Sequence, residues 1–125
     1  MLIDTDVLIW FMRGNPKARI AIDQQQPFSL SVVTYMKVVQ GMRNQEELVA
    51  LRKALPQWEA KVLYLTEEMS AKAMMYVEKY ALSHSLYLAD ALIGATAVAC
   101  SLSLLSANAK HYRVIPDLDL QVFRS

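Results

Sequence analysis

The stretch Met1-Leu-Ile-Asp-Thr-Asp6 opens the chain and joins a short apolar run to two carboxylates. A third isolated carboxylate, Asp90, begins an apolar stretch that continues to Leu105. An ionised carboxylate on an apolar element loses hydration unless a partner charge, hydrogen bonds or a metal ion compensates it. If these carboxylates, which come from distant parts of the chain, converge in the fold, they would form a site for a divalent cation. The sequence predicts such a site.

Short β-rich runs alternate along the chain with helical patterns. Strands are predicted at 1–4, 28–33, 61–65 and 102–106, with a further edge strand at 121–123. Helices are predicted at 7–12, from Pro16 onward, and at 34–42, 45–58, 67–83 and 89–100. Alternation of this kind favours a parallel sheet covered by helices. We therefore expect a three-layer α/β/α fold with a central, mostly parallel sheet of about four to five strands.

Length and composition fit one domain that spans residues 1–125. A chain of 125 residues with 54% hydrophobic residues can bury a core without disulfides or structural metals. The formal net charge of +1 argues against a generally basic nucleic-acid wrapper, although it permits a local basic patch. The lone Cys100 has no intramolecular disulfide partner and is expected to be a small buried hydrophobe, which favours a cytoplasmic protein.

No segment is predicted to enter a membrane. The N-terminus lacks the positive region and the small-residue cleavage site of a secretory signal. The apolar stretch 92–105 is shorter than the roughly 20 residues that a bilayer crossing needs. It is predicted to be a central buried helix that runs into a strand.

Polar residues follow the predicted strands at their carboxyl ends, where ligands collect in an open parallel sheet. Asp90 lies in the first turn of its helix and belongs to the same set. The residues expected to face one pocket are Asp4, Asp6, Thr34, Lys37, Asp90 and Asn108.

Lys37 breaks a local rule of helix formation. If Thr34 is the N-cap, Lys37 is the third helical residue, where a capping box favours glutamate. The helix dipole disfavours a cation there by about 0.3 to 1 kcal/mol. An unfavourable residue of this kind is expected where other groups of the fold compensate its cost. The candidate counter-charges to the Lys37 ammonium group are Asp4, Asp6 and Asp90.

Four segments match the sequence blocks of a known family in order and in spacing. They are Leu2-Ile-Asp-Thr-Asp-Val-Leu-Ile9, Ser31-Val-Val-Thr-Tyr-Met-Lys-Val-Val-Gln-Gly41, Ala89-Asp-Ala-Leu-Ile-Gly-Ala-Thr-Ala97 and Leu104-Leu-Ser-Ala-Asn-Ala-Lys-His-Tyr112. Together they resemble the blocks of a PIN domain, and among PIN domains they look most like the VapC toxins. The resemblance implies a magnesium-dependent endoribonuclease, with Mn²⁺ as an alternative ion. It also implies a homodimer and a small antitoxin protein that covers the site.

The resemblance assigns roles to individual residues. Asp4 matches the first metal-binding aspartate of the family, and Asp90 matches the other acid that holds the ion most directly. Asn108 falls where the family has aspartate or asparagine and would orient water or phosphate. Ser106 matches the hydroxyl residue that precedes this position.

Two positions depart from the family pattern. Asp6 replaces the usual asparagine or serine and adds a carboxylate beside Asp4. Lys37 occupies the position of a family glutamate, so its ammonium group would compete with the metal ion by charge and by volume. Loss of a water-orienting base costs roughly 10²- to 10⁴-fold in rate. The resemblance therefore implies a nuclease that Lys37 severely impairs.

Two other functional classes stay open. The first is the same fold reduced to a module that binds RNA or an antitoxin without cutting. The second is a signalling receiver domain, which shares the length, the parallel sheet and an acidic pair after the first strand. A receiver needs a phospho-accepting aspartate at the end of its third strand, whereas Thr66 follows the strand that is predicted to end at Leu65.

The remaining polar and soft side chains have ordinary structural interpretations. His84 and His111 lack metal-ligand spacing and are assigned no catalytic role. The residues expected to form core or dimer contacts are Met69, Met74, Met75, Tyr76 and Tyr80. The residues expected to contact RNA phosphates are Arg13, Lys17, Arg19, Lys110 and Arg113.

Overall fold

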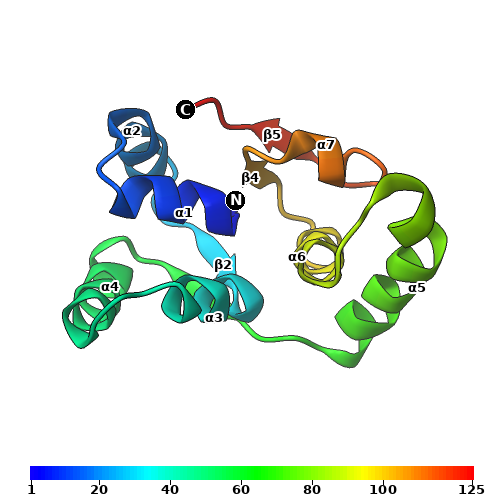
Figure 1. Ribbon diagram of the computed structural model, residues 1–125, viewed down its shortest axis with the longest axis horizontal. Coiled ribbons are helices and arrows are strands. Elements are labelled where there is room, and N and C mark those ends of the chain that lie inside the picture. The colour runs from blue at the N-terminus through cyan, green and yellow to red at the C-terminus, as the bar shows by residue number, and fades with distance from the viewer.

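The computed structural model describes all 125 residues and contains one five-stranded sheet (Figure 1). The strands are β1 (Leu2–Ile3), β2 (Ser29–Ser31), β3 (Lys61–Leu63), β4 (Leu104–Ser106) and β5 (Leu120–Val122). Every neighbouring pair is parallel, and the spatial order is β3-β2-β1-β4-β5. The predicted edge strand near residue 121 is therefore confirmed as β5, and the sheet is parallel throughout.

Helices connect the strands. They are α1 (Thr5–Met12), α2 (Pro16–Gln24), α3 (Val32–Gln40), α4 (Gln45–Gln57), α5 (Glu67–His84), α6 (Leu88–Ala99) and α7 (Ala109–Tyr112). Polar side chains fix several of the starts: Asn15, Asn44 and Thr66 each accept a hydrogen bond from a backbone N–H in the first turn. The six longer helices were predicted, whereas the single turn of α7 was not. A helix of four residues is too short to show a 3.6-residue period.

Two apolar cores lie on opposite faces of the sheet. Leu2 and Leu104 belong to the core that includes residues of α5, α6 and α7, whereas Ile3 and Leu105 belong to the core under α1, α2 and α4. Successive side chains of a strand point to opposite faces, so β1 and β4 each supply both cores. The result is the expected three-layer α/β/α fold, with α6 buried between α5 and the sheet.

The start of α3 differs from the prediction. The N-cap is Ser31, whose side chain accepts a hydrogen bond of 3.1 Å from the Val33 N–H, and the helix begins at Val32. Thr34 is therefore inside the helix, and Lys37 lies toward its carboxyl end. The expected dipole penalty on Lys37 is wrong, because a cation is favourable in the last turn of a helix. Ser31 and Thr34 both carry the hydroxyl of a cap, but the Thr34 hydroxyl accepts a hydrogen bond from Thr5 instead of a backbone N–H.

Cys100 also differs from the prediction, because it is exposed rather than buried. It follows the last residue of α6, and Ser101 turns the chain with a φ of 53° before β4 begins. The helix end thus directs this side chain away from the core. None of the helices combines the length and the apolar character that a membrane crossing requires.

Candidate active site

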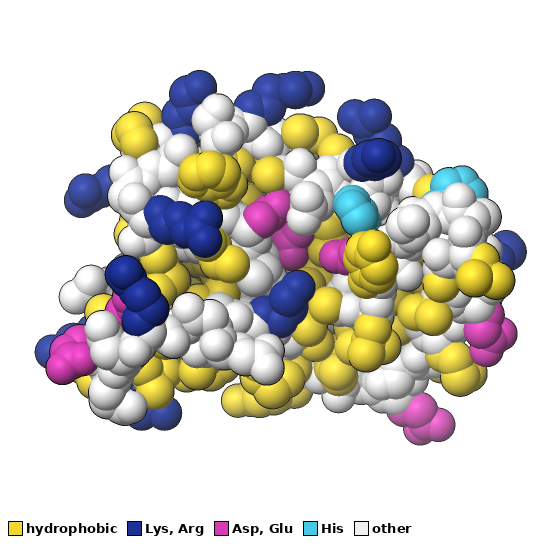
Figure 2. All heavy atoms as spheres, viewed as in Figure 1, with side chains coloured by type: hydrophobic (Ala, Val, Ile, Leu, Met, Phe, Trp, Pro, Cys, Tyr) yellow, Lys and Arg dark blue, Asp and Glu magenta, His cyan; other side chains and the backbone are white.

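A cavity of about 180 Å³ opens near the carboxyl ends of β1 and β4. The chain proceeds from β1 to β2 and β3 on one side of the sheet, and then crosses to β4 and β5 on the other. Ligand sites of open parallel sheets form at such a reversal of strand order. The residues that line the cavity are Asp4, Thr5, Asp6, Ile9, Lys37, Asp90 and Asn108. Figure 2 shows acidic side chains gathered at the middle of this face, with a histidine and hydrophobic side chains beside them.

Asp4 joins β1 to α1 and to the end of β4. It is the N-cap of α1, and one carboxylate oxygen accepts a hydrogen bond of 2.8 Å from the Thr5 N–H. The other oxygen accepts a hydrogen bond of 2.7 Å from the Ser106 hydroxyl. Only 3% of Asp4 is exposed, and hydrogen bonds from α1 and β4 hold its carboxylate.

Asp6 lies in the first turn of α1 and approaches the segment after β4. Its Oδ2 accepts a hydrogen bond of 3.0 Å from the Ala107 N–H, and the Ser106 hydroxyl lies 3.5 Å away. Its Oδ1 is buried and has no hydrogen-bond partner. A buried carboxylate oxygen without a partner is costly, so this position is suited to a cation.

Burial and mutual repulsion make the acidic pair hold protons more tightly than usual. Burial, and then the charge of Asp6, raise the pKa of Asp4 from its ordinary 3.8 to about 6. Burial also raises the pKa of Asp6. Beneath them, the Tyr112 hydroxyl is buried close to Asp4 without a hydrogen bond of normal geometry, and burial raises its pKa well above the ordinary value. The site therefore carries more negative charge than its protein surroundings stabilise.

Asp90 reaches the same cavity from the third position of α6. Its Oδ2 lies 3.7 Å from Nδ1 of His111, and the side chain of Asp90 is only 15% exposed. The Nδ1 atom of His111 makes no hydrogen bond. His111 therefore lies next to Asp90, although the spacing of the two histidines in the sequence gave no indication of this position. It lies on the unpredicted α7, three residues after Asn108.

Asn108 is the N-cap of α7, although its side chain makes no capping hydrogen bond. Its backbone N–H donates a hydrogen bond of 2.9 Å to the Ser106 hydroxyl. Ser106 thereby links Asn108 to Asp4. The amide side chain of Asn108 remains available to the cavity that it lines.

Lys37 lines the cavity from α3, but its side chain is exposed. No carboxylate of the cavity lies within the 4.0 Å of an ion pair with it. Lys37 therefore forms no direct ion pair with the three aspartates, although all four residues line one cavity. Thr34 does not line the cavity. Its side chain is buried, and its hydroxyl accepts a hydrogen bond of 3.3 Å from the Thr5 hydroxyl.

The donor atoms of the cavity fit a hard divalent ion such as Mg²⁺. Three carboxylates face it, and one of their buried oxygens is unpaired. No set of three carboxylate, histidine or cysteine side chains converges closely enough to enclose an ion. This arrangement suits Mg²⁺ in particular, which keeps several waters and uses one or two protein carboxylates together with substrate phosphates.

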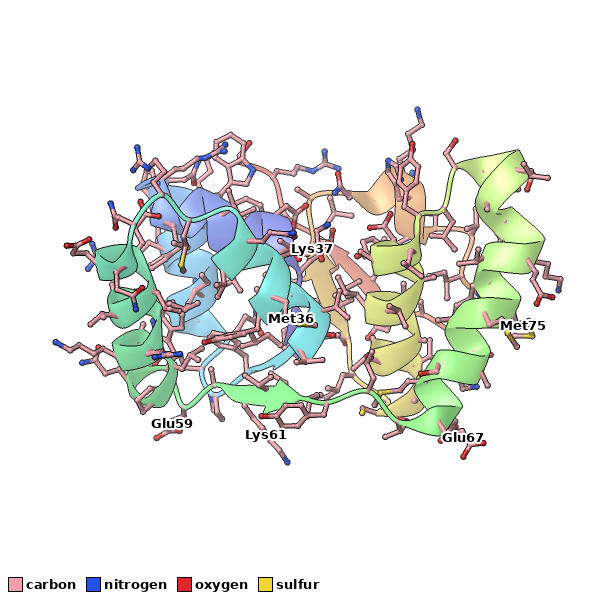
Figure 3. The ribbon with its side chains drawn as sticks, turned by 60° about the horizontal axis from the view of Figure 1, so that its bottom comes forward. Met36, Lys37, Glu59, Lys61, Glu67 and Met75 are labelled. Carbon is pink, nitrogen blue, oxygen red and sulfur yellow. The ribbon has the colours of Figure 1, made fainter.

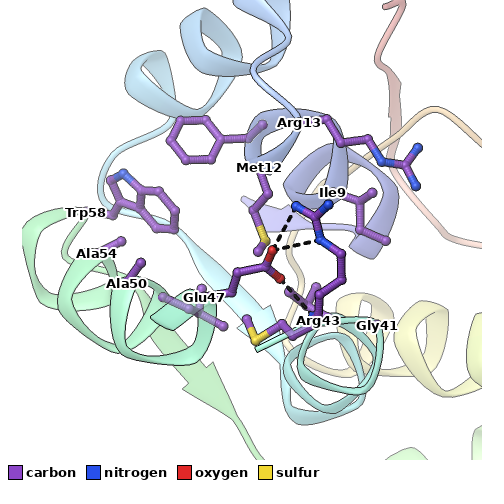
Figure 4. Close-up of a pocket in the computed structure, with 13 residues that line it drawn as sticks. Ile9, Met12, Arg13, Gly41, Arg43, Glu47, Ala50, Ala54 and Trp58 are labelled. Carbon is purple, nitrogen blue, oxygen red and sulfur yellow. Dashed lines mark hydrogen bonds and ion pairs between the residues drawn. The ribbon is translucent and has the colours of Figure 1, made fainter. Parts of the chain in front are cut away.

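A second, larger cavity of about 610 Å³ lies between α1, α3 and α4 (Figure 4). Its wall is mostly apolar and includes Met12, Leu51 and Trp58. One edge carries the ion pair between Arg43 and Glu47, with an N···O distance of 3.1 Å. Ile9 lines both cavities, so the apolar cavity adjoins the acidic one.

Comparison with known proteins identifies the family. The PIN domain family model matches residues 1–115. Ribonuclease VapC19 of Mycobacterium tuberculosis is 30% identical over 123 residues, which cover 94% of this chain and 95% of that protein. The chain therefore belongs to the PIN domain family, and its relationship is to the VapC-type ribonucleases of toxin-antitoxin pairs.

Solved structures show the same fold. A toxin-antitoxin complex from Klebsiella pneumoniae has a TM-score of 0.81 at 25% identity, covering 97% of this chain and 95% of the other. VapBC-1 from nontypeable Haemophilus influenzae has a TM-score of 0.78 at 22% identity, covering 97% and 96%. DNA-bound VapBC from Salmonella typhimurium has a TM-score of 0.81 at 16% identity, with the same coverage. The expected PIN-like architecture is thus confirmed over nearly the whole chain.

Proposed function

We propose that this chain is a metal-dependent endoribonuclease of the VapC type that hydrolyses phosphodiester bonds in the acidic cavity. One observation carries the proposal: Asp4, Asp6 and Asp90, from two separate elements, line one cavity at the reversal of strand order. Burial, and then the charge of Asp6, raise the pKa of Asp4 to about 6, and a bound cation would favour the charged form of this carboxylate.

Asp4 and Asp90 are the residues that would hold Mg²⁺, with Mn²⁺ as a substitute. Such an ion, when bound, supplies a water of lowered pKa and neutralises charge on the scissile phosphate. The chain itself fixes the position of Asp4 through the hydrogen bonds from Thr5 and Ser106. Asn108 would orient the phosphate or a water, because its side-chain amide has no capping role.

Lys37 is the feature that lowers the expected activity. A glutamate there would make the cavity two charge units more negative and would provide a further oxygen ligand. The ammonium group instead repels a divalent ion in the same cavity. Figure 3 shows Lys37 on the side of α3 that faces α1, whereas Lys61 projects from β3 out of the molecule. Lys61 is therefore a matched position for testing a charge reversal away from the site.

The test is magnesium-dependent cleavage of single-stranded RNA by three proteins: the natural chain, Lys37→Glu and Lys61→Glu. We expect Lys37→Glu to cut about 10²- to 10⁴-fold faster than the other two, in line with the value of a positioned general base. Cleavage by Lys37→Glu should stop when a chelator removes the metal. Equal rates for all three proteins would show that Lys37 does not impair the site.

A second candidate is a PIN domain that binds RNA or an antitoxin without cutting. The observation that favours it is the Lys37 ammonium group in a cavity of carboxylates. If neither the natural chain nor Lys37→Glu cleaves RNA in magnesium or manganese, while RNA binding persists, this binding function replaces the nuclease.

Two protein partners are part of the proposal. The first is an antitoxin, because the similar solved structures are toxin-antitoxin complexes and a large apolar cavity adjoins the acidic one. The second is another copy of this chain, because Met74, Met75 and Leu82 leave apolar surface exposed on α5. Co-expression with the product of a neighbouring reading frame, and light scattering of the free chain, test these partners. A cytoplasmic location remains a prediction from the sequence.

A further inference from the structure

Tyr87 and His111 form an aromatic pair beside the acidic cavity. Their ring centroids are 5.7 Å apart, and the ring planes are inclined by only 33°. His111 is held next to Asp90, with 3.7 Å between Nδ1 and Oδ2. The pair therefore begins at an acid of the site and extends outward from it.

The outer ring of this pair is uncovered. Tyr87 is 63% exposed, and as the N-cap residue of α6 it makes no side-chain capping hydrogen bond. It lies three positions before Asp90, so the ring and the carboxylate belong to the same end of one helix. A large ring that neither fills a core nor caps its helix is free to contact a ligand.

We propose that Tyr87, backed by His111, is a stacking platform for an unpaired nucleobase next to the phosphate that the acidic cavity receives. This inference rests on the proposed ribonuclease function and extends it to how the substrate is held. Bases of single-stranded RNA stack on tyrosine and histidine rings, whereas bases of a duplex are already stacked on each other. The platform thus selects an unpaired nucleotide at the cleavage site.

The surroundings of the pair suit an RNA strand. Lys110 precedes His111 on α7, Arg113 follows the same helix, and both side chains are exposed. Cations beside an aromatic ring can contact the phosphates on either side of a stacked base. The acid, the rings and the cations therefore belong to neighbouring positions of α6 and α7, and they are the kinds of group that contact a nucleotide and its flanking phosphates.

The first test is binding of a short fluorescent single-stranded RNA to the natural chain without added metal, measured by anisotropy. Tyr87→Ala should weaken binding about 10-fold, the value expected for one stacked base, while Tyr87→Phe stays within about twofold because the ring remains. Tyr64→Ala is the matched control, because Tyr64 is 73% exposed and lines neither cavity. A duplex of the same sequence should bind equally to Tyr87→Ala and to the natural chain.

The second test uses cleavage in the Lys37→Glu background. Adding Tyr87→Ala should raise KM by about 10-fold and leave kcat within about twofold, because the platform binds the strand before reaction. Photo-crosslinking with 5-iodouridine RNA should label Tyr87 or His111, as read by mass spectrometry of the peptides.

The outcomes separate the two proposals. Cleavage by Lys37→Glu with an unchanged KM in the Tyr87→Ala variant overturns the platform and leaves the nuclease intact. Absence of both RNA binding and cleavage overturns the two together. A change of oligomeric state in Tyr87→Ala, measured by light scattering, would assign the ring to a protein contact and also overturn the platform.

Discussion

The Ser106 hydroxyl donates a hydrogen bond of 2.7 Å to Asp4, although 102 positions of the sequence separate the two residues. Leu104 and Leu105 pair directly with Leu2 and Ile3, so the ends of β1 and β4 arrive together. This hydrogen bond holds Asp4, which lines the acidic cavity, to the end of β4. It also positions Asn108, whose backbone N–H donates to the same hydroxyl.

Removing that hydroxyl should destabilise the fold. Ser106→Ala leaves a buried carboxylate oxygen without its donor, which costs about 1 to 3 kcal/mol in the free energy of unfolding. Urea unfolding at pH 7 measures this loss. Ser70→Ala is the control, because Ser70 is exposed on α5, and it should stay within about 0.5 kcal/mol of the natural chain. Equal free energies of unfolding for the two variants would show that the Ser106 hydroxyl does not stabilise Asp4.

The pKa of Asp4 predicts the direction of the pH dependence of stability. Its value in the fold, about 6, lies above its ordinary 3.8, so the folded chain binds this proton more tightly than the unfolded chain. The stabilising contribution is complete below about pH 4 and is lost as the pH rises through 6. Without metal, the melting temperature should therefore fall between pH 5 and pH 7.

Asp4→Asn should flatten that pH profile. Asparagine keeps a carbonyl oxygen for the cap of α1 and carries no charge to desolvate. A pKa difference of about two units corresponds to about 3 kcal/mol, so the variant should gain up to that amount at pH 7 in chelator. Thermal unfolding of both proteins across this pH range measures the difference. If the natural chain melts at the same temperature at pH 5 and pH 7, Asp4 does not titrate as proposed.

Metal binding should depend on the charge at position 37. Calorimetry with Mg²⁺ or Mn²⁺ should show binding to Lys37→Glu that is tighter by at least about tenfold, because two charge units change within the same cavity. Lys61→Glu should bind as the natural chain does. Metal should also raise the melting temperature of Lys37→Glu, and a chelator should reverse this increase. Equal affinities of Lys37→Glu and Lys61→Glu would place the ion away from the cavity.

RNA binding should weaken steeply with salt. Each phosphate contact on a single strand releases counterions and adds about 0.7 to the slope of log affinity against log salt. Lys110→Ala should remove one phosphate contact and lower that slope by about 0.7. Lys53→Ala, on the exposed surface of α4, should leave the slope unchanged. Titrations at several salt concentrations give the slopes. An affinity that does not change with salt would exclude binding through phosphate contacts.

The sequence contained the local information about the fold. Strand and helix positions followed from the alternation of apolar runs and helical periods, because that pattern depends on neighbouring residues. The sequence also predicted for the same reason that Asp4, at the end of an apolar run, lines the cavity. The start of α3 was not predictable, because Ser31 and Thr34 offer the same cap chemistry and only their hydrogen bonds in the fold distinguish them.

Only the tertiary structure decided how the distant residues meet. The strand order β3-β2-β1-β4-β5 places β1 beside β4, and this brings the segments that carry Asp4 and Asn108 to one cavity. Helix packing places His111 beside Asp90 and turns Tyr87 outward. It also leaves the Lys37 ammonium group without an ion pair. The sequence specifies which carboxylates, rings and cations exist, whereas packing in three dimensions determines the distances between them, and electrostatic interactions depend on distance.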